Sequence, residues 1–377
     1  MYHYHQHKPG GWNRHIEPQI EILENAVVCP STSPFYNDIG IFVQESTVFK
    51  SDGEVCELSL HLAGDLGFDN IPGPYPGDID QSVRVGTHFY GGVLIGHFGH
   101  FLFESLARLW GVDQLNTELQ SIVFVKGWGL MGPDGQGALM VPHFVDEALR
   151  LLSLGGERTV IHQKPVRYQR LVVASQLYGS RLLRGHPYFH QFVHRLKGVK
   201  PVNQVKDDCS GVYISRRKLL GGGGLLCEAV LEENLRRYGY TIIYPEELTI
   251  EQQVSIYNTN RRLIFAEGSA LHLFCFVATE QHDVVVIDRR VQGIPHVIDQ
   301  IISFGAPKIH EINCVIGHMF RNDSDMEHGD VLAMAMLDFN LLGASLAARG
   351  FIPDQDQWRT PTAEELAFAR AALMGEE

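Results

Sequence analysis

The chain has 377 residues, of which 45% are hydrophobic and 20% are charged, a composition typical of a globular protein with room for two domains. Its formal net charge is −13 with the acidic residues dispersed, which excludes a general affinity for nucleic acid or for anionic membranes. An anionic ligand must therefore be held by a local cluster of cations.

The six cysteines lie far apart and form no Cys-x-x-Cys pair, so we expect reduced thiols in a cytoplasmic protein. The sequence holds no run of about 20 apolar residues, and no secretory signal pattern precedes the first predicted strand. These features together predict a soluble protein.

Residues 1–204 are predicted to form an N-terminal α/β domain, with the domain boundary inside a polar linker over residues 198–208. The apolar pattern predicts strands over residues 21–28, 41–49, 55–62, 84–90, 121–125 and 170–174, and helices over residues 144–152 and 187–197.

The segment GHFGHFLFESLARLW (residues 96–110) predicts a helix with a polar stripe on an apolar surface. His100, Glu104 and Arg108 are spaced four residues apart and therefore share one face of a regular helix. One interpretation is a surface ion-pair ladder, worth a few tenths of a kcal/mol per pair. The other is a site in which His97 and His100 face a cleft while Glu104 orients the imidazole.

Residues 205–325 predict a second, Rossmann-like domain, with strands over residues 212–215, 241–244, 263–266 and 284–288 and helices between them. Thr249 and Gln252 form a capping box that opens one helix, and Gly239 ends the helix before it. The charged residues 288–290 after the last of these strands are interpreted as a solvated turn. Residues 326–377 are predicted to be helical over 325–346 and 362–374.

Polar residues follow two of these strands. The first set is Ser215, Arg216, Arg217 and Lys218, before four glycines, and the second is Glu267, Gly268, Ser269, Ala270 and His272. The carboxyl ends of parallel strands meet at one edge of a sheet, and helix N-termini there present N–H donors to anions. Because guanidinium groups bind phosphate through two parallel hydrogen bonds, the sequence predicts a diphosphate site at this edge.

The order of these motifs resembles the glycosyltransferase 61 family. YISRRK, the helix opened by Cys227 and Glu228, PEEL, EQQ and EGSALH are similar to its signature half, and GHFLFESLARLW resembles its His-x-x-x-Glu-x-x-x-Arg helix. The chain departs from the family pattern at three places in the expected donor site. Cys227 and His272 stand where asparagine is frequent, and Glu267-Gly268-Ser269 stands where His-Gly-Ala is frequent.

The resemblance implies an inverting glycosyltransferase of the GT-B type, with two Rossmann-like domains facing a central cleft and C-terminal helices that return to the first domain. It implies a nucleotide-sugar donor, such as a UDP-sugar, and a glycan or lipid-linked saccharide acceptor in capsular or surface polysaccharide synthesis. The acceptor would allow peripheral membrane contact. The nucleotide-sugar is a substrate, so no cofactor is expected.

The resemblance also assigns roles within the two predicted sites. His100 is the expected catalytic base, with Glu104 as its orienting partner or as the base itself, and His97 and Arg108 lie on the acceptor side. Arg216, then Arg217 and Lys218, neutralise the leaving diphosphate with help from the helix that opens at Ser269.

Two other classes of function remain open at this point. One is a catalytically inactive nucleotide-binding subunit of a polysaccharide-assembly complex, and the other is a hydrolase that uses His100 and Glu104 on a sugar phosphate. Metal independence is expected because none of the three Asp-x-Asp pairs follows an apolar strand. These pairs are Asp78/Asp80, Asp323/Asp325 and Asp354/Asp356.

Overall fold

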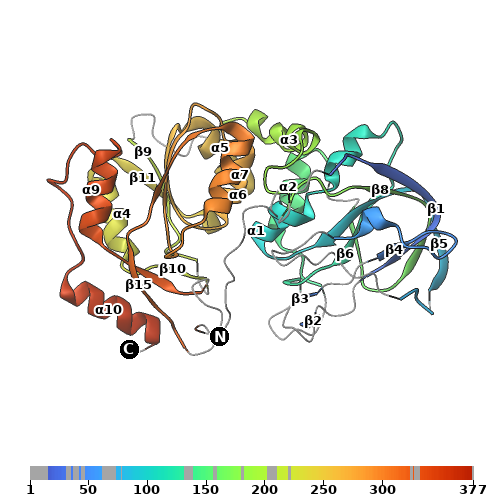
Figure 1. The fold of residues 1–377 in the computed structure, drawn as a ribbon, viewed down its shortest axis with the longest axis horizontal. Helices are drawn as coiled ribbons and strands as arrows, with labels where there is room; N and C mark the ends of the chain where they lie inside the picture. The colour runs from blue at the N-terminus through green and yellow to red at the C-terminus, as the bar shows by residue number, and fades with distance from the viewer. Residues whose placement is uncertain are drawn as a thin grey trace. The chain divides into compact units, whose positions relative to one another are not determined.

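The computed structural model describes residues 16–30, 35–36, 42–43, 47–61, 74–77, 79–130, 139–155, 159–179, 182–201, 210–219, 222–322, 326 and 332–375. The chain divides into two compact units, an N-terminal unit of residues 7–198 and a C-terminal unit that contains residues 199–377 (Figure 1). Each unit combines strands and helices and has its own buried hydrophobic cluster, which confirms the predicted α/β class.

A six-stranded sheet in the order β4-β1-β8-β5-β6-β7 forms the core of the N-terminal unit. β8, β5, β6 and β7 are parallel to one another. At one edge, β1 pairs antiparallel with β8, and β4 pairs antiparallel with β1. The strands are β1 (Ile20–Cys29), β4 (Thr47–Phe49), β5 (Asp80–Leu94), β6 (Ser121–Lys126), β7 (Thr159–His162) and β8 (Val166–Ala174), with a separate antiparallel pair of β2 (Phe35–Tyr36) and β3 (Phe42–Val43).

Short helices surround this sheet. They are α1 (Phe98–His100), the π-helical turn η2 (Phe101–Ser105), α2 (His143–Leu151), α3 (Pro187–Val193) and the 3-10 helices η1 (Glu57–Ser59), η3 (Leu109–Gln114) and η5 (His194–Gly198). The strand predicted over residues 55–62 is wrong, because its described part has the η1 turn at its centre and no strand. The Ser59 hydroxyl donates to the Cys56 carbonyl at 2.7 Å and accepts from the Val48 amide at 3.1 Å, which closes the turn.

The main sheet of the C-terminal unit is entirely parallel, in the order β11-β9-β12-β13-β14. Its strands are β9 (Gly211–Ile214), β11 (Tyr240–Ile243), β12 (Arg262–Ala266), β13 (Asp283–Ile287) and β14 (Lys308–Ile312). The first strand in sequence, β9, therefore has β11 on one side and β12 on the other, so the winding direction changes at β9. This order confirms a Rossmann-like arrangement.

Helices cover both faces of this sheet (Figure 1). The helices of this unit are α4 (Glu228–Arg237), the 3-10 helix η6 (Pro245–Glu247), α5 (Ile250–Thr259), α6 (Ala270–Val277), α7 (Pro295–Gly305), α9 (Phe339–Ala348) and α10 (Ala363–Met374). The predicted capping box of Thr249 and Gln252 opens α5, and Gly239 follows α4 with a φ of 81°. Both sequence signals are confirmed.

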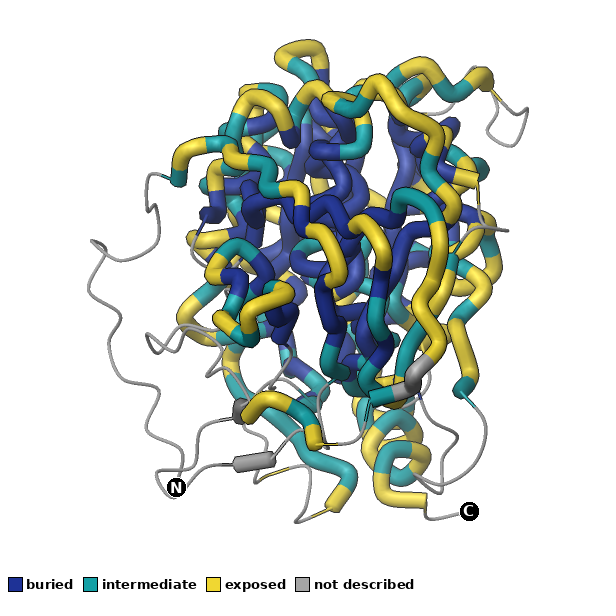
Figure 2. Tube along the Cα trace, turned by 90° about the vertical axis from the view of Figure 1, so that its right-hand side faces the viewer, coloured by how far each residue is buried: buried dark blue, intermediate teal, exposed yellow. Residues whose placement is uncertain are grey.

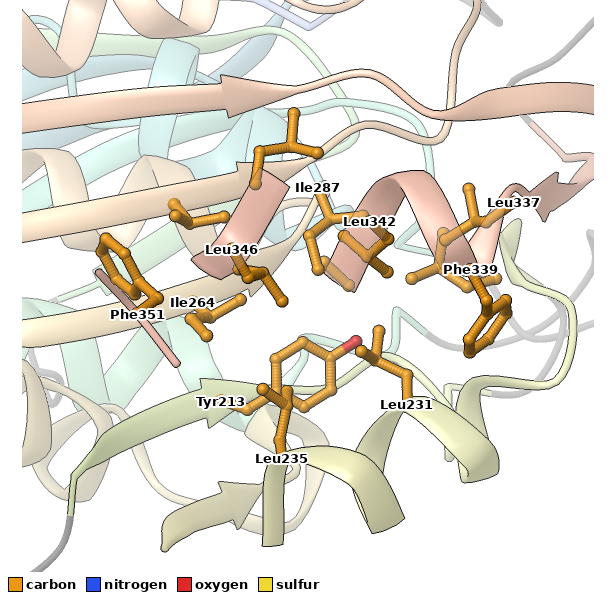
Figure 3. Packing of buried hydrophobic residues seen from close by; sticks show 14 of the residues in the cluster. Tyr213, Leu231, Leu235, Ile264, Ile287, Leu337, Phe339, Leu342, Leu346 and Phe351 are labelled. Atoms are coloured by element: carbon orange, nitrogen blue, oxygen red, sulfur yellow. The ribbon is translucent and has the colours of Figure 1, made fainter. Parts of the chain in front are cut away.

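The two faces of the parallel sheet pack against different helices. On one face Tyr213, Ile264 and Ile287 belong to one buried cluster with Leu231 and Leu235 of α4 and Leu342 and Leu346 of α9 (Figure 3). On the other face Phe265 contacts Tyr257 of α5 and Phe274 of α6, with ring centroids 5.7 and 5.2 Å apart. The central strands are thus buried on both sides, as their apolar runs predict.

The C-terminal segment differs from the prediction over residues 334–337. These residues, predicted as helix, form β16 (Met334–Leu337) in a small sheet with β10 (Gly224–Leu225) and β15 (Val315–Met319). α9 packs within the core of the C-terminal unit. α10 carries no buried residue and belongs to the same unit (Figure 2), where Arg359 joins Glu365 of α10 to Glu233 of α4.

Among the residues that the structure describes, none of the helices is both long and apolar enough to cross a lipid bilayer.

Candidate functional site

The first cluster of candidate residues follows β5 in the N-terminal unit. In the sheet, β6 and then β7 lie on one side of β5, whereas β8, which follows them in the sequence, lies on the other side of β5. The carboxyl end of β5 is therefore a point where the winding direction reverses, the position at which open α/β sheets bind ligands. His97, His100 and Glu104 all lie within ten residues of Leu94, the last residue of this strand.

Glu104 lies between two histidines. His100 Nδ1 donates to Glu104 Oε1 at 3.0 Å, and His61 Nε2 bonds Glu104 Oε2 at 3.0 Å. The Glu104 side chain is 6% exposed, whereas the His100 side chain is 45% exposed. The predicted pairing of His100 and Glu104 is thus present, and His61 is a partner that the sequence did not indicate.

The pKa values of this pair move in opposite directions. Burial alone would raise the pKa of Glu104, but hydrogen bonds from His100 and His61 lower it to about 2. Burial opposes the charged form of His100, yet the bond to the Glu104 carboxylate raises its pKa overall. Because Nδ1 donates to Glu104, the neutral ring carries its basic lone pair on Nε2. His100 therefore has the properties of an oriented general base.

Aromatic rings surround His100. The Trp128 ring lies 5.0 Å from the His100 ring and 5.6 Å from the His97 ring, measured between centroids, and the two histidine rings lie 5.2 Å apart. The Gly96 amide donates to the Trp128 carbonyl at 2.8 Å. A Cβ atom at residue 96 would lie 2.0 Å from the Gly129 carbonyl oxygen, so glycine is needed for this close approach.

Arg108, predicted to share a face with His100 and Glu104, binds backbone carbonyls inside the N-terminal unit. The π-helical turn η2 adds a residue to the helix, with the Leu106 amide bonded to the Phe101 carbonyl at 3.2 Å. Arg108 is 2% exposed and donates to the Ala174 carbonyl at 2.6 Å and to the carbonyls of Leu58 and Leu60. Its guanidinium thus joins three chain segments inside the N-terminal unit.

The second cluster lies in the C-terminal unit, at the carboxyl ends of β9 and β12. Arg216 Nε and Nη2 donate to the Gly223 carbonyl at 3.2 and 2.9 Å, which fixes the guanidinium plane. A Cβ atom at residue 268 would lie 2.0 Å from Arg216 Nη1, so only glycine lets the guanidinium lie over this turn. Arg216 and Gly268 therefore meet at the point where the winding of the sheet reverses, as predicted.

Ser215 is held inside the protein. Its hydroxyl lies 2.9 Å from both Glu228 Oε1 and Glu232 Oε1, and the residue is fully buried. Glu228 Oε1 also accepts from the Arg216 amide at 2.8 Å and from the Tyr213 hydroxyl at 2.7 Å. Burial raises the pKa of Glu228. Ser215, predicted to contact the ligand, instead belongs to a buried network that fixes the backbone carrying Arg216.

Arg217 and Lys218 turn toward β11. Arg217 Nε donates to Glu232 Oε1 at 3.0 Å and Nη2 donates to the Tyr244 hydroxyl at 3.1 Å. Lys218 pairs with Glu247 at 2.7 Å and lies 4.0 Å from the centroid of the Tyr244 ring. The expectation that three cations converge on one ligand is therefore supported only for Arg216.

The turn after β12 is organised by Glu267, which is 2% exposed. Its carboxylate accepts from the Arg289 amide at 2.8 Å and pairs with Arg290 Nη1 at 3.2 Å, so it orders neighbouring arginines instead of facing a ligand. Ser269 makes no side-chain cap of α6. Ser269, Ala270 and His272 are each half-buried in the first turn of α6, where the leading amides lack intrahelical partners.

One of the three Asp-x-Asp pairs can be placed. Asp354 and Asp356 are exposed, and the Asp356 amide donates to Asp354 Oδ1 at 3.0 Å, which is the bonding of a solvated Asx turn. Asp78 and the pair Asp323/Asp325 lie outside the described residues. Within the described part of the chain, His, Cys, Asp and Glu side chains form no group of three or more that could hold a metal ion.

These two clusters define the class of the protein. A half-buried arginine lies over a glycine turn in one unit, and the other unit carries a histidine–glutamate pair. Side chains of these types can bind an anionic group and transfer a proton, which is the chemistry of group-transfer enzymes. The family model of glycosyltransferase 61 matches residues 98–286, which is half of the chain and includes most of both clusters. The chain belongs to the glycosyltransferase 61 family, and this membership implies glycosyltransferase activity with a donor and an acceptor. Among curated proteins no match was found.

The structure explains one departure of this chain from the family pattern. Cys227, which stands where asparagine is frequent, has a φ of 59° and a ψ of 30° just before α4. Asparagine is several-fold enriched in this left-handed region, so the backbone conformation gives a structural reason for asparagine at this position.

Proposed function

We propose that this glycosyltransferase is an inverting enzyme that transfers a sugar from a nucleotide-sugar, a UDP-sugar, to a hydroxyl group of a glycan or polysaccharide. The observation that supports the donor site best is the position of Arg216 against Gly268 at the carboxyl ends of β9 and β12. A guanidinium held by a backbone carbonyl on one edge presents its remaining donors in a fixed plane, which suits an oxygen-rich diphosphate.

In the proposed reaction the acceptor oxygen forms a bond to the anomeric carbon while the bond from that carbon to the diphosphate oxygen breaks. The proton of the acceptor hydroxyl passes to the base, and the electron pair of the broken bond stays on the diphosphate. Arg216 and the N-terminus of α6 stabilise that developing charge.

His100 is the base in this proposal, with Glu104 as its orienting residue. Both oxygens of the Glu104 carboxylate accept hydrogen bonds from histidines, and its pKa of about 2 makes it a weak base. His100 is partly exposed, and its bond to the Glu104 carboxylate raises its pKa, which makes the imidazole a stronger base. His97 and Trp128, which flank the His100 ring, would line the acceptor side.

We extend the proposal to the two-domain GT-B type, in which the C-terminal unit supplies the donor site and the N-terminal unit supplies the acceptor site. The acceptor would be a glycan or a lipid-linked saccharide in the synthesis of a capsular or surface polysaccharide. A lipid-linked acceptor would bring the enzyme to the membrane surface.

The proposal predicts selective stabilisation by one nucleotide-sugar. We expect a thermal-shift screen against UDP, GDP, CMP and their common sugar conjugates to identify a uridine ligand, because a ligand present at 100 times its dissociation constant stabilises by about 2.7 kcal/mol. Transfer of the sugar from that ligand to an acceptor then tests catalysis. Stabilisation without turnover for any acceptor would instead favour the inactive nucleotide-binding subunit.

The proposed role of Arg216 also predicts metal independence. Because a guanidinium and a helix N-terminus supply the positive charge, we expect transfer to keep most of its rate in excess EDTA. The measurement is the initial rate before chelation, after chelation and after adding magnesium or manganese. An activity that disappears with EDTA and returns with a divalent ion would contradict the arginine-based mechanism and direct attention to the Asp-x-Asp pairs.

A further inference from the structure

The turn after β13 carries two arginines, Arg289 and Arg290, to which the proposed reaction assigns no role. β12 is hydrogen-bonded to β13 on one side and to β9 on the other, so the carboxyl ends of β9 and β13 flank that of β12 at about 4.8 Å each. Arg216 and Arg290 therefore approach the Glu267-Gly268 turn from opposite sides. The sequence pattern by itself favours a solvated turn here.

The backbone around Arg290 is fixed from several directions. The Asn313 side-chain amide donates to the carbonyls of Arg290 and Val291, both at 3.0 Å, and His318 Nε2 donates to the Arg289 carbonyl at 2.7 Å. The Arg289 amide and its Nε donate to Glu267 at 2.8 and 2.9 Å. Arg289 is 3% exposed, so it acts as the anchor of the turn.

The two arginines of this turn differ in exposure. The Arg290 side chain is 26% exposed, while its Nη1 lies 3.2 Å from Glu267 Oε1. Glu267 thus fixes one edge of the Arg290 guanidinium, as the Gly223 carbonyl fixes one edge of Arg216. The positive charge of Arg290 also contributes, after burial, to the lowered pKa of Arg216, as expected for two guanidinium groups close to each other.

We propose that Arg290 is a second diphosphate ligand, oriented by Glu267, which completes with Arg216 a two-arginine clamp around the Glu267-Gly268 turn. Two phosphoryl groups supply enough oxygens for both guanidinium groups. Each guanidinium is already oriented by an acceptor on its other edge, the Gly223 carbonyl for Arg216 and the Glu267 carboxylate for Arg290. Pre-orientation reduces the conformational entropy that binding would cost. The inference rests on the proposed donor site and assigns to it a residue from the neighbouring strand.

The test is isothermal titration with inorganic pyrophosphate, which probes the clamp without knowledge of the nucleotide or the sugar. We expect Arg290→Ala to bind pyrophosphate roughly 10- to 150-fold more weakly than wild type, the range for losing one charge-assisted hydrogen bond. The matched control is Arg370→Ala, which removes the same charge from the exposed face of α10 and should bind like wild type. Arg290→Gln keeps a polar group beside Glu267 and should show the same loss if Arg290→Ala fails to fold.

Glu267→Gln tests the orienting role through the sign of its effect. Removing a negative charge near an anion site strengthens anion binding if only charge matters, whereas loss of Arg290 orientation weakens it. We expect weaker pyrophosphate binding. Tighter binding by Glu267→Gln, or wild-type affinity in a folded Arg290 variant, would overturn the inference and leave the transferase proposal intact. A wild-type protein that does not bind pyrophosphate also overturns the clamp, while sugar transfer itself remains measurable with the donor.

Discussion

Replacing Arg216 with alanine is expected to abolish sugar transfer and to weaken UDP binding by about 100-fold or more, while uridine affinity changes little. The guanidinium is held against Gly268 by the Gly223 carbonyl, and its loss removes charge-assisted hydrogen bonds worth about 1.5–3 kcal/mol each. The measurement is a titration of wild type and Arg216→Ala with UDP and with uridine, alongside the initial rate of transfer.

Arg217→Ala is the informative comparison for this variant. It removes an identical side chain from the next position, but Arg217 pairs with Glu232 and Tyr244 on the β11 side. We therefore expect Arg217→Ala to retain most of the affinity for UDP. Equal UDP affinity in Arg216→Ala and wild type, or a larger loss in Arg217→Ala, would show that the diphosphate lies elsewhere.

The second large effect is expected at His100. His100→Ala should lower the turnover number by about 10²- to 10⁴-fold with donor affinity nearly unchanged, because the residue is assigned to the acceptor oxygen and not to the nucleotide. Separate measurement of the turnover number and of the donor dissociation constant tests this assignment. If donor affinity collapses together with the rate, His100 is a nucleotide ligand or a folding residue, and the base must be sought among other groups.

The pH dependence follows from the same pair of residues. A base is active when deprotonated, so the rate should fall as the pH drops through the raised pKa of His100. Glu104→Gln removes the carboxylate that raises this pKa while burial still lowers it, so the acid limb of the rate profile should shift to lower pH. An acid limb that stays in place or moves to higher pH would contradict His100 as the titrating group.

Most of the parallel sheet could be predicted from the sequence, because central strands buried on both faces are continuous apolar runs. The start of α5 and the end of α4 could also be predicted, because a capping box and a glycine after a helix act on residues only a few positions away. The segment of β16 was predicted as helix because Met, Ala and Leu favour helices. Its strand form depends on pairing with β15 and β10, which local pattern does not report.

The same distinction between local and distant information applies to the candidate sites. The pairing of His100 with Glu104 follows from a spacing of four residues, and the meeting of Arg216 with Gly268 follows from the rule for parallel strands. His61 bonds Glu104 across 43 positions of sequence and lies in a stretch that alternates like a strand. The directions of the Arg217 and Lys218 side chains could not be predicted, because their acceptors come from a different part of the chain. Arg217 donates to the Tyr244 hydroxyl and Lys218 donates to the Glu247 carboxylate, and both acceptors follow β11.

The π-helical turn after His100 has a consequence for how the N-terminal unit tolerates change. One additional residue rotates everything beyond it by about 100° relative to a regular helix, so a single segment serves two separate tasks. Residues before and within the turn hold the imidazole and its carboxylate, while Arg108 beyond it joins the carbonyls of Leu58, Leu60 and Ala174. A one-residue deletion within the turn would therefore rotate the Arg108 guanidinium away from these carbonyls and leave all three without their common donor.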